Sequence, residues 1–251
     1  MAVVIPGTLL LVARTTRSQA YVQALAARGL RTEHLFVYGD AGKTQRAPDG
    51  IERCELPDLF VPDLTLTLEQ AAIRDGWQTR YLDAYALDDP GLVAAIRDQA
   101  PRLIVFSGYP AQMVPPALTQ IAPVLHCHSG ALPRYRGSTT LYYALLEGQR
   151  PAVSALLVDA GIDSGRIVAM QDYAPPPPGA DIDHLFDGAI RADLLTTVLA
   201  EYARDGSFVR TVAETAEQGQ LYFIVHPVLK HIALASLGNP SPCAQPSPPN
   251  C

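Results

Sequence analysis

The chain has 251 residues, of which 48% are hydrophobic and 18% are charged, and its formal net charge is −6. This composition is typical of one soluble globular domain with a small appendage, and the acidity argues against a general affinity for nucleic-acid phosphates. The four cysteines contain no CxxC pair and no apolar run is long enough to cross a membrane, so we predict no metal site, disulfide framework or membrane span and expect a cytoplasmic protein.

The N-terminal part of the sequence has the pattern of a β-α-β unit. Residues 8–13 and 35–38 are apolar runs typical of buried strands, and residues 18–28 between them have apolar positions at helical spacing. No GxGxxG sequence follows the first strand, so a dinucleotide-binding fingerprint is absent. Arg14 and Arg17 lie beside the predicted helix start, where an anion can bind, but a solvated loop is the simpler interpretation.

Further strands and helices alternate through the middle of the chain. After a connection rich in Gly, Pro and charge, the sequence predicts a helix at 66–75, a short strand at 79–82, a helix at 90–97, a central strand at 102–107 and a loop at 108–116. Alternating strands and helices of this length favour a doubly wound α/β sheet, which binds ligands beyond the carboxyl ends of its strands.

Two histidines follow the next buried strand. Residues 121–125 form an apolar run that leads directly into His126 and His128, whose side chains lie on one face because they are two residues apart. Cys127 points to the opposite face, so we predict that it packs in the core and does not act as a nucleophile. Titratable rings at the end of a buried strand are typical of a site at the carboxyl edge of a parallel sheet.

A carboxylate is predicted to complete this site. The strand-like run at 152–158 ends in a loop that contains Asp159, Gly161 and Asp163. We expect the two strands to be parallel and to end side by side, which would bring Asp163 to His128. A carboxylate that faces an imidazole raises the pKa of the ring and fixes its tautomer.

The remainder of the chain completes the sheet and adds an appendage. The sequence predicts a helix at 139–147, a strand at 166–172, a long amphipathic helix from 182 to 202 and a late hairpin that pairs 208–212 with 221–225. We therefore expect a mostly parallel, doubly wound α/β sheet of about seven strands in residues 1–205, an extension of hairpin and helix in 206–237 and a mobile, proline-rich tail in 238–251.

The stretch that follows the two histidines and the loop at 159–165 together resemble the formyltransferase family. This family includes methionyl-tRNA, glycinamide ribonucleotide and sugar N-formyltransferases. The family pattern is Asn-x-His-x-Ser-Leu-Leu-Pro-x-Tyr-Arg-Gly followed by Asp-x-Gly-x-Asp-Thr-Gly. Here the matching stretches are His128-x-x-x-Leu-Pro-Arg-Tyr-Arg-Gly137 and Asp159-x-Gly-Ile-Asp-Ser-Gly165, in the same order. A weaker resemblance extends from about residue 8 to about residue 230, and it implies the family's Rossmann-like fold.

One departure from the family pattern falls within the catalytic trio of Asn, His and Asp. His128 and Asp163 match, but His126 stands at the Asn position, and Gly130 and Ala131 replace the family's Ser and Leu. The resemblance implies that His128 assists proton transfer and stabilises the oxyanion, with Asp163 as its partner. A neutral imidazole at 126 can donate a hydrogen bond as Asn does, an imidazolium donates a stronger one, and either form can also exchange a proton. Loss of the activity is the alternative.

The resemblance also implies the substrates. The donor would be 10-formyltetrahydrofolate, and the positions that match the family's folate-binding segments are Gly108, Tyr109, Ala111, Gln112, Met113, Val114, Asp159 and Gly161. Arg134, Tyr135 and Arg136 are candidates for the acceptor pocket, although they can equally shape the loop.

The acidic chain favours a small amine, such as an amino sugar, an amino acid or a specialised metabolite, over tRNA. Two other functions stay open: altered one-carbon chemistry such as formylfolate hydrolysis, and a non-catalytic folate-binding role. The reaction requires no metal, and the sequence leaves the oligomeric state open.

Overall fold

The computed structural model describes residues 2–40, 55–208 and 219–238. Seven strands form one sheet in the order β3-β2-β1-β4-β5-β7-β8. In chain order they are β1 (Val3–Ala13), β2 (Leu30–Tyr38), β3 (Thr79–Leu82), β4 (Leu103–Ser107), β5 (Val124–His128), β7 (Ala152–Val158) and β8 (Gly165–Asp172). The first five are parallel, whereas β7 and β8 are antiparallel to their neighbours. The mostly parallel, doubly wound α/β sheet of about seven strands is confirmed.

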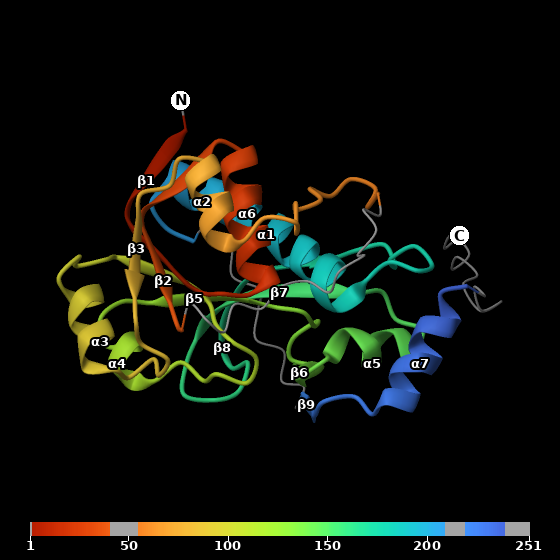
Figure 1. The fold of residues 1–251 in the computed structure, drawn as a ribbon. Coiled ribbons are helices and arrows are strands. Elements are labelled where there is room, and N and C mark those ends of the chain that lie inside the picture. The colour runs from red at the N-terminus through yellow and green to blue at the C-terminus, as the bar shows by residue number, and fades with distance from the viewer. Residues whose placement is uncertain (1, 41–54, 209–218, 239–251) are drawn as a thin grey trace, which may run out of the picture.

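Helices cover both faces of this sheet (Figure 1). One face packs against α1 (Thr16–Ala27), α2 (Leu68–Arg74) and α6 (Asp187–Asp205), and the other against α3 (Pro90–Arg97) and α4 (Pro116–Thr119). Because both faces are covered, residues 9–13 of β1 are fully buried and the strand is apolar without alternation. The predicted helix at 90–97 has the observed bounds, because Asp89 caps its first amides and Pro90 occupies the first turn.

A smaller group of elements lies beyond the end of the sheet that carries the histidines. It consists of β6 (Tyr135–Gly137), α5 (Thr140–Leu146), β9 (Gln220–Tyr222) and α7 (Pro227–Ser236), of which β6 and β9 pair in parallel (Figure 1). Of the hairpin strand predicted at 221–225, only residues 221 and 222 belong to β9, which pairs with β6. Its predicted partner at 208–212 falls almost entirely in 209–218, which lies outside the described residues, as do residues 239–251 of the predicted tail.

The predicted parallel pairing of the histidine strand with the strand at 152–158 is wrong. β5 and β7 are antiparallel, with His128 opposite Ser154 and Leu125 opposite Leu157. The chain that leaves the carboxyl end of β5 re-enters the sheet at the same edge, so the carboxyl ends of the two strands lie at opposite edges. Asp163 must therefore reach His128 by a different route from the one predicted.

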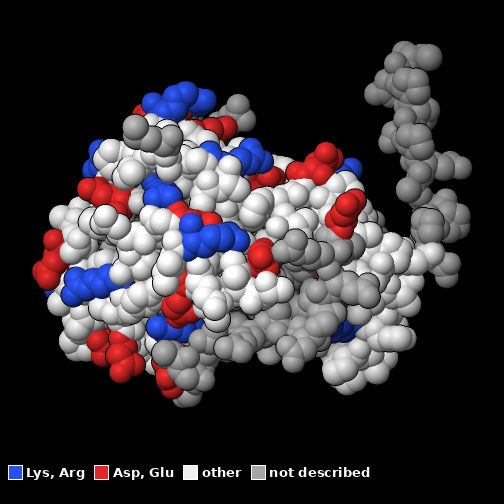
Figure 2. Space-filling view, turned by 45° about the horizontal axis from the view of Figure 1, so that its top comes forward, with Lys and Arg blue, Asp and Glu red and all other residues white. Residues whose placement is uncertain are grey.

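No helix in the described ranges is long and apolar enough to cross a membrane. On the face seen in Figure 2, basic and acidic side chains are interspersed and do not form an extended patch of one sign. Proteins that track nucleic-acid backbones usually present a basic stripe, which this face does not.

Candidate active site

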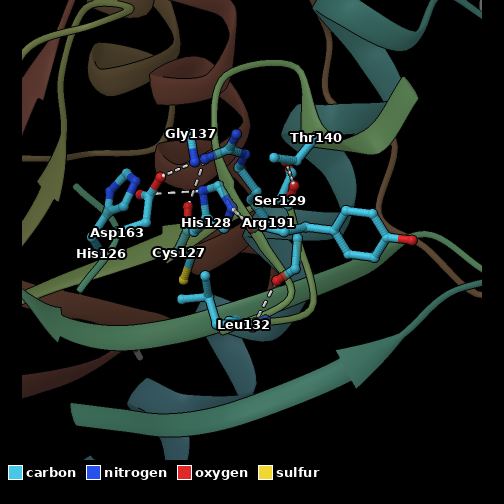
Figure 3. A network of polar contacts seen from close by, with 12 residues as sticks. His126, Cys127, His128, Ser129, Leu132, Gly137, Thr140, Asp163 and Arg191 are labelled. Carbon is cyan, nitrogen blue, oxygen red and sulfur yellow. Dashed lines mark hydrogen bonds and ion pairs between the residues drawn. The ribbon is translucent and has the colours of Figure 1, made fainter. Parts of the chain in front are cut away.

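His126, His128 and Asp163 lie together at the carboxyl edge of the parallel strands (Figure 3). The two histidines project from the same side of β5, as their spacing predicts, while the Cys127 sulfur points to the other side. Cys127 is 1% exposed within the core under α1 and α6, and burial raises the pKa of its thiol to about 12. The predicted packing role of Cys127 is confirmed.

The His128 ring is enclosed, and both of its nitrogens contact protein acceptors. Its Nδ1 lies 3.2 Å from Oδ1 of Asp163, and its Nε2 lies 2.8 Å from the carbonyl oxygen of Tyr135. Only a doubly protonated ring can donate to both neighbours at once. With a residue exposure of 3%, His128 has no nitrogen open to a ligand in this arrangement.

Gly130 makes the contact between His128 and Tyr135 possible. A Cβ at position 130 would lie 2.6 Å from Nε2 of His128 and 2.6 Å from the Tyr135 carbonyl oxygen. Cβ atoms do not approach other atoms so closely, so any side chain here would displace the ring or the carbonyl. The exchange of the family's Ser for Gly at 130 is therefore coupled to the orientation of the His128 ring.

Asp163 reaches His128 because the loop after β7 folds back over the end of β5. Asp163 adopts a left-handed backbone conformation, with φ +45°, and its Oδ2 accepts from the Gly137 amide at 2.8 Å. Burial raises the pKa of Asp163, but the hydrogen bond and charge of His128 and the Gly137 amide outweigh it and lower this pKa to about 2. The carboxylate is therefore ionised at neutral pH and joins two loops.

His126 differs from His128 because, among the described residues, only its Nδ1 has a hydrogen-bond partner. Its Nδ1 lies 3.3 Å from the Phe106 carbonyl oxygen, which can only accept, so Nδ1 carries the proton and Nε2 is a bare acceptor. Burial and the nearby charges of Arg17 and Arg191 lower the pKa of His126 to about 3. The ring is therefore neutral at neutral pH, and the imidazolium form is disfavoured.

Other side chains fix the end of β5 and the turn after it. Ser154 donates to the Gly130 carbonyl at 2.7 Å and accepts from the Leu132 amide at 3.1 Å. Arg191 of α6 donates to the Cys127 carbonyl at 2.7 Å and pairs with Asp187 at 2.9 Å. The bonds of Ser154 and the bond from Arg191 to Cys127 span between 22 and 64 residues along the chain, so sequence spacing gives no sign of them, whereas Arg191 and Asp187 are one helical turn apart.

The loop at 108–116 is held by the side-chain amide of Gln112. Its Oε1 accepts from the Tyr38 hydroxyl at 2.6 Å and the Tyr109 amide at 2.9 Å, and its Nε2 donates to the Tyr85 carbonyl at 2.9 Å. By contrast, the N–H groups of Ala111, Met113 and Val114 donate to no atom in the described part of the chain. These three predicted cofactor-binding positions therefore offer backbone donors to a ligand.

The remaining predicted residues divide between two places. Asp159 accepts from the Gly161 amide at 3.0 Å and from the Ser164 hydroxyl, which closes the loop at 159–165, and the charge of Arg136 lies close enough to help lower the pKa of Asp159. The side chains of Arg134 and Tyr135 instead turn to Glu147 at the end of α5, at 2.8 Å and 2.7 Å. Tyr135 contributes only its carbonyl, which lies against His128. The structure therefore does not bring the side chains of Arg134 and Tyr135 to the candidate site.

A cavity of about 220 Å³ opens next to the end of β5, the strand that carries His126 and His128. His126, His128 and Asp163 do not line it, but Ser129 and Pro110, which follow β5 and β4, do. It is lined by Thr15, Thr16, Arg17, Pro110, Ser129, Thr139, Thr140, Leu141, Tyr142, Ile182, Asp183, Asp187 and Arg191. In the sequence, Arg17 is visible as a cation beside a helix start, whereas Asp187 and Arg191 look like ordinary surface positions of an amphipathic helix. No group of three or more His, Cys, Asp or Glu side chains in the described residues is placed to hold a metal ion.

Comparison with known sequences finds the formyl transferase family, whose model matches residues 9–185. Methionyl-tRNA formyltransferase of Sulfurovum sp. is 31% identical over 91 residues, which are 36% of this chain and 30% of that protein. Its counterpart in Chloroflexus aurantiacus is 36% identical over 128 residues, which are 49% of this chain and 41% of that protein. The chain thus spans less than half the length of these curated relatives.

Comparison with solved structures finds the same fold. A sugar N-formyltransferase from a Shewanella species has a TM-score of 0.56 at 15% identity, over 90% of this chain and 86% of that one. A phosphoribosylglycinamide formyltransferase from Bacillus halodurans has a TM-score of 0.54 at 16% identity, over 81% of this chain and 98% of that one. At such identities the likeness establishes the fold alone.

Proposed function

The chain belongs to the formyl transferase family, and we propose that it transfers a formyl group from 10-formyltetrahydrofolate to the amine of a small acceptor. The observation that carries this proposal is the bare, neutral Nε2 of His126 beside the His128–Asp163 pair. Formyl transfer to an amine requires a group that accepts a proton from the attacking nitrogen, and it requires no covalent nucleophile.

The loops that would hold the folate fit such a ligand. The backbone donors of Ala111, Met113 and Val114 are unused within the described residues, and a pterin ring presents both donors and acceptors. The Met113 and Ile162 side chains, one from each loop, are 49% and 45% exposed and give apolar surface for a ring system. These features support binding of the donor between 108–116 and 159–165, and the bound folate would supply the activated formyl group.

We assign three roles to the chain's own residues. His126 accepts the proton of the acceptor amine at Nε2. The low pKa of His126 makes the ring a weak base, but the amine nitrogen carries a positive charge once it has attacked the formyl carbon and is then acidic. Asp163 holds His128, and this pair fixes the two loops around the reaction site. For His128 to donate to a developing oxyanion, its Nε2 would first have to leave the Tyr135 carbonyl.

A small acceptor is favoured over tRNA. The relatives named above include methionyl-tRNA formyltransferases, but this chain has a net charge of −6 and intermixed surface charges on the face seen in Figure 2. Binding to tRNA phosphates is driven by clustered cations. An amino sugar, an amino acid or a specialised metabolite suits the cavity of about 220 Å³ better.

Hydrolysis of the formylfolate is the second candidate, because a bare imidazole nitrogen can equally accept a proton from water. Release of tetrahydrofolate from 10-formyltetrahydrofolate, measured with and without a panel of small amines, separates the two. We expect release that depends on the amine. Release at the same rate without any amine would favour hydrolysis. If calorimetry with a formylfolate analogue detected no binding at millimolar concentration, both proposals would be wrong.

A further inference from the structure

Two residues of α6 contact the chain on both sides of His128. Nη1 of Arg191 donates to the carbonyl oxygen of Cys127 at 2.7 Å (Figure 3). A carboxylate oxygen of Asp187 accepts from the hydroxyl of Ser129, and the other lies 2.9 Å from Nε of Arg191. These four residues around His128 form one connected set, which we call the α6 clamp.

The clamp can form because Asp187 and Arg191 are one turn apart on α6. Residues at this spacing lie on the same face of a helix, so the carboxylate and the guanidinium meet without distorting it. The π-helix Ile182–Phe186 ends directly before Asp187, and its wider turn sets which face of α6 is presented to β5. Single π-helical turns are frequent at functional sites.

The clamp acts where β5 has lost one of its two neighbours. In the described part of the chain, the pairing of β5 with β4 ends at His126, whereas the pairing with β7 continues to His128. Arg191 therefore adds a hydrogen bond to the strand just beyond the end of β4. Because the donor is charged, this bond is stronger than one between neutral groups.

Stability alone does not account for the ion pair in the clamp. The side chains of Arg191 and Asp187 are only 12% and 21% exposed, and the desolvation of two such charges offsets most of their attraction. Both residues also line the cavity next to the end of β5, so the pair faces the candidate site as well as the core.

We propose that Arg191 is a positioning residue of formyl transfer, which holds the end of β5 so that Nε2 of His126 meets the attacking amine. This inference rests on the proposed function and adds a residue that acts through His126. Placement of this kind matters for the rate, because a displacement of about 1 Å can cost on the order of a hundredfold. Asp187 orients the guanidinium for this task.

Arg191 also acts on His126 through its charge. Burial is the largest cause that lowers the pKa of His126, and the charges of Arg17 on α1 and Arg191 on α6 add to it. His128 on the same strand lowers this pKa further, whereas Asp163 in the loop after β7 raises it. Removal of the Arg191 charge should therefore raise the pKa of His126.

Two variants separate the position of Arg191 from its charge. Arg191→Met removes both the charge and the hydrogen bonds. Arg191→Lys keeps the charge but lacks the planar fork that contacts Asp187 and the Cys127 carbonyl together. Arg204→Met is the matched control, because Arg204 belongs to the same helix and its side chain is 70% exposed.

The experiment has two readouts on the full chain. The first is single-turnover tetrahydrofolate release with glucosamine, glycine or hydroxylamine as the amine, normalised to the number of sites that bind a formylfolate analogue. This normalisation removes the effect of any unfolded fraction. The second is NMR titration of the His126 ring without substrates, which does not depend on formyl transfer.

We expect Arg191→Met to lose about ten- to a hundredfold in rate per folate site, with a raised pKa of His126. Arg191→Lys should restore the pKa of His126 but keep most of the loss in rate, because the charge returns and the geometry does not. Arg204→Met should match the wild type in both readouts.

Two results would overturn the assignment. The first is an equal rate per folate site in Arg191→Met and Arg204→Met. The second is a wild-type rate in Arg191→Lys, which would mean that only the charge matters; this comparison decides alone if Arg191→Met does not fold. A wild type that releases no tetrahydrofolate with any of these amines would instead contradict the proposed function. In that case, unchanged His126 ring signals in Arg191→Lys would show that Arg191 does not position the strand.

Discussion

The Nδ1 atom of His126 faces the carbonyl oxygen of Phe106 across 3.3 Å. Because a carbonyl only accepts hydrogen bonds, this contact places the ring proton on Nδ1 and leaves Nε2 without one. A ring in this tautomer accepts a hydrogen bond at the open side and cannot donate one there. His126 is therefore chemically different from the Asn amide that it replaces in the family pattern, although both are small, polar and uncharged.

Asp163→Asn should lower the rate of formyl transfer at least about a hundredfold while the fold stays intact. The amide cannot supply the negative charge that faces Nδ1 of His128, although its oxygen can still accept from the Gly137 amide. Single-turnover release of tetrahydrofolate measures the rate, and Asp172→Asn on the exposed end of β8 is the control. An Asp163→Asn rate equal to that of the control would mean that Asp163 only shapes the loop.

Gly130→Ala should lower the free energy of unfolding by about 1–3 kcal/mol and break the contact between His128 and Tyr135. The added Cβ would lie 2.6 Å from both partner atoms of that contact. Chemical denaturation measures the loss, and Gly238→Ala, where the nearest atom to an added Cβ is 3.7 Å away, is the control. Equal stability of the two variants would show that the His128 ring tolerates a side chain at 130.

Acidification should destabilise the wild type more than His126→Asn between about pH 6.5 and pH 3. The unfolded chain takes up a proton at its ordinary histidine pKa, whereas burial and two arginines hold the pKa of His126 in the folded chain at about 3. The unfolded state thus binds more protons in this window, so stability falls as pH falls, by at most about 1.4 kcal/mol per pH unit from this residue.

Denaturant unfolding at several pH values gives the slope of stability against pH. His231→Asn on the exposed side of α7 is the control, because it removes a histidine that the fold does not bury. If His126→Asn and His231→Asn had the same slope as the wild type over this range, His126 would titrate alike in the folded and unfolded chains.

Ser154→Ala should cost about 1–3 kcal/mol of stability, because Ser154 is fully buried and its loss leaves the Gly130 carbonyl and the Leu132 amide without their partner. The turn that carries His128 to Tyr135 would loosen as well, so the rate of formyl transfer should fall with the Tm. Ser207→Ala at an exposed position after α6 is the control. A Tm within the scatter of this control would contradict the role of Ser154 in holding the turn.

The central strands could be predicted from the sequence because β4, β5 and most of β7 are buried and form continuous apolar runs, whereas the edge strand β3 is partly exposed. The strand at 79–82 and the helix at 90–97 were predicted with their observed bounds. The orientation of β7 could not be predicted, because an apolar strand has the same pattern in either direction. The family pattern placed His128 and Asp163 in one site even though the geometric argument for their proximity was wrong.

The details that govern the chemistry lie in contacts between distant parts of the chain. The sequence shows that Gly130 departs from the family pattern, but the consequence appears only once Tyr135 is seen opposite the ring. Arg191 reaches β5 from a helix 64 residues away. Arg17 could be noted beside a helix start, but its lack of an ion-pair partner among the described residues requires the folded chain.

The rate of formyl transfer in His126→Asn, compared with His126→Ala and the wild type, tests the central claim most directly. If the bare Nε2 accepts the proton of the amine, Asn cannot replace it, and both variants should lose about a hundred- to ten-thousand-fold in single-turnover tetrahydrofolate release. Near-wild-type release in His126→Asn, with a large loss only in His126→Ala, would contradict the account and make position 126 a hydrogen-bond donor to the oxyanion.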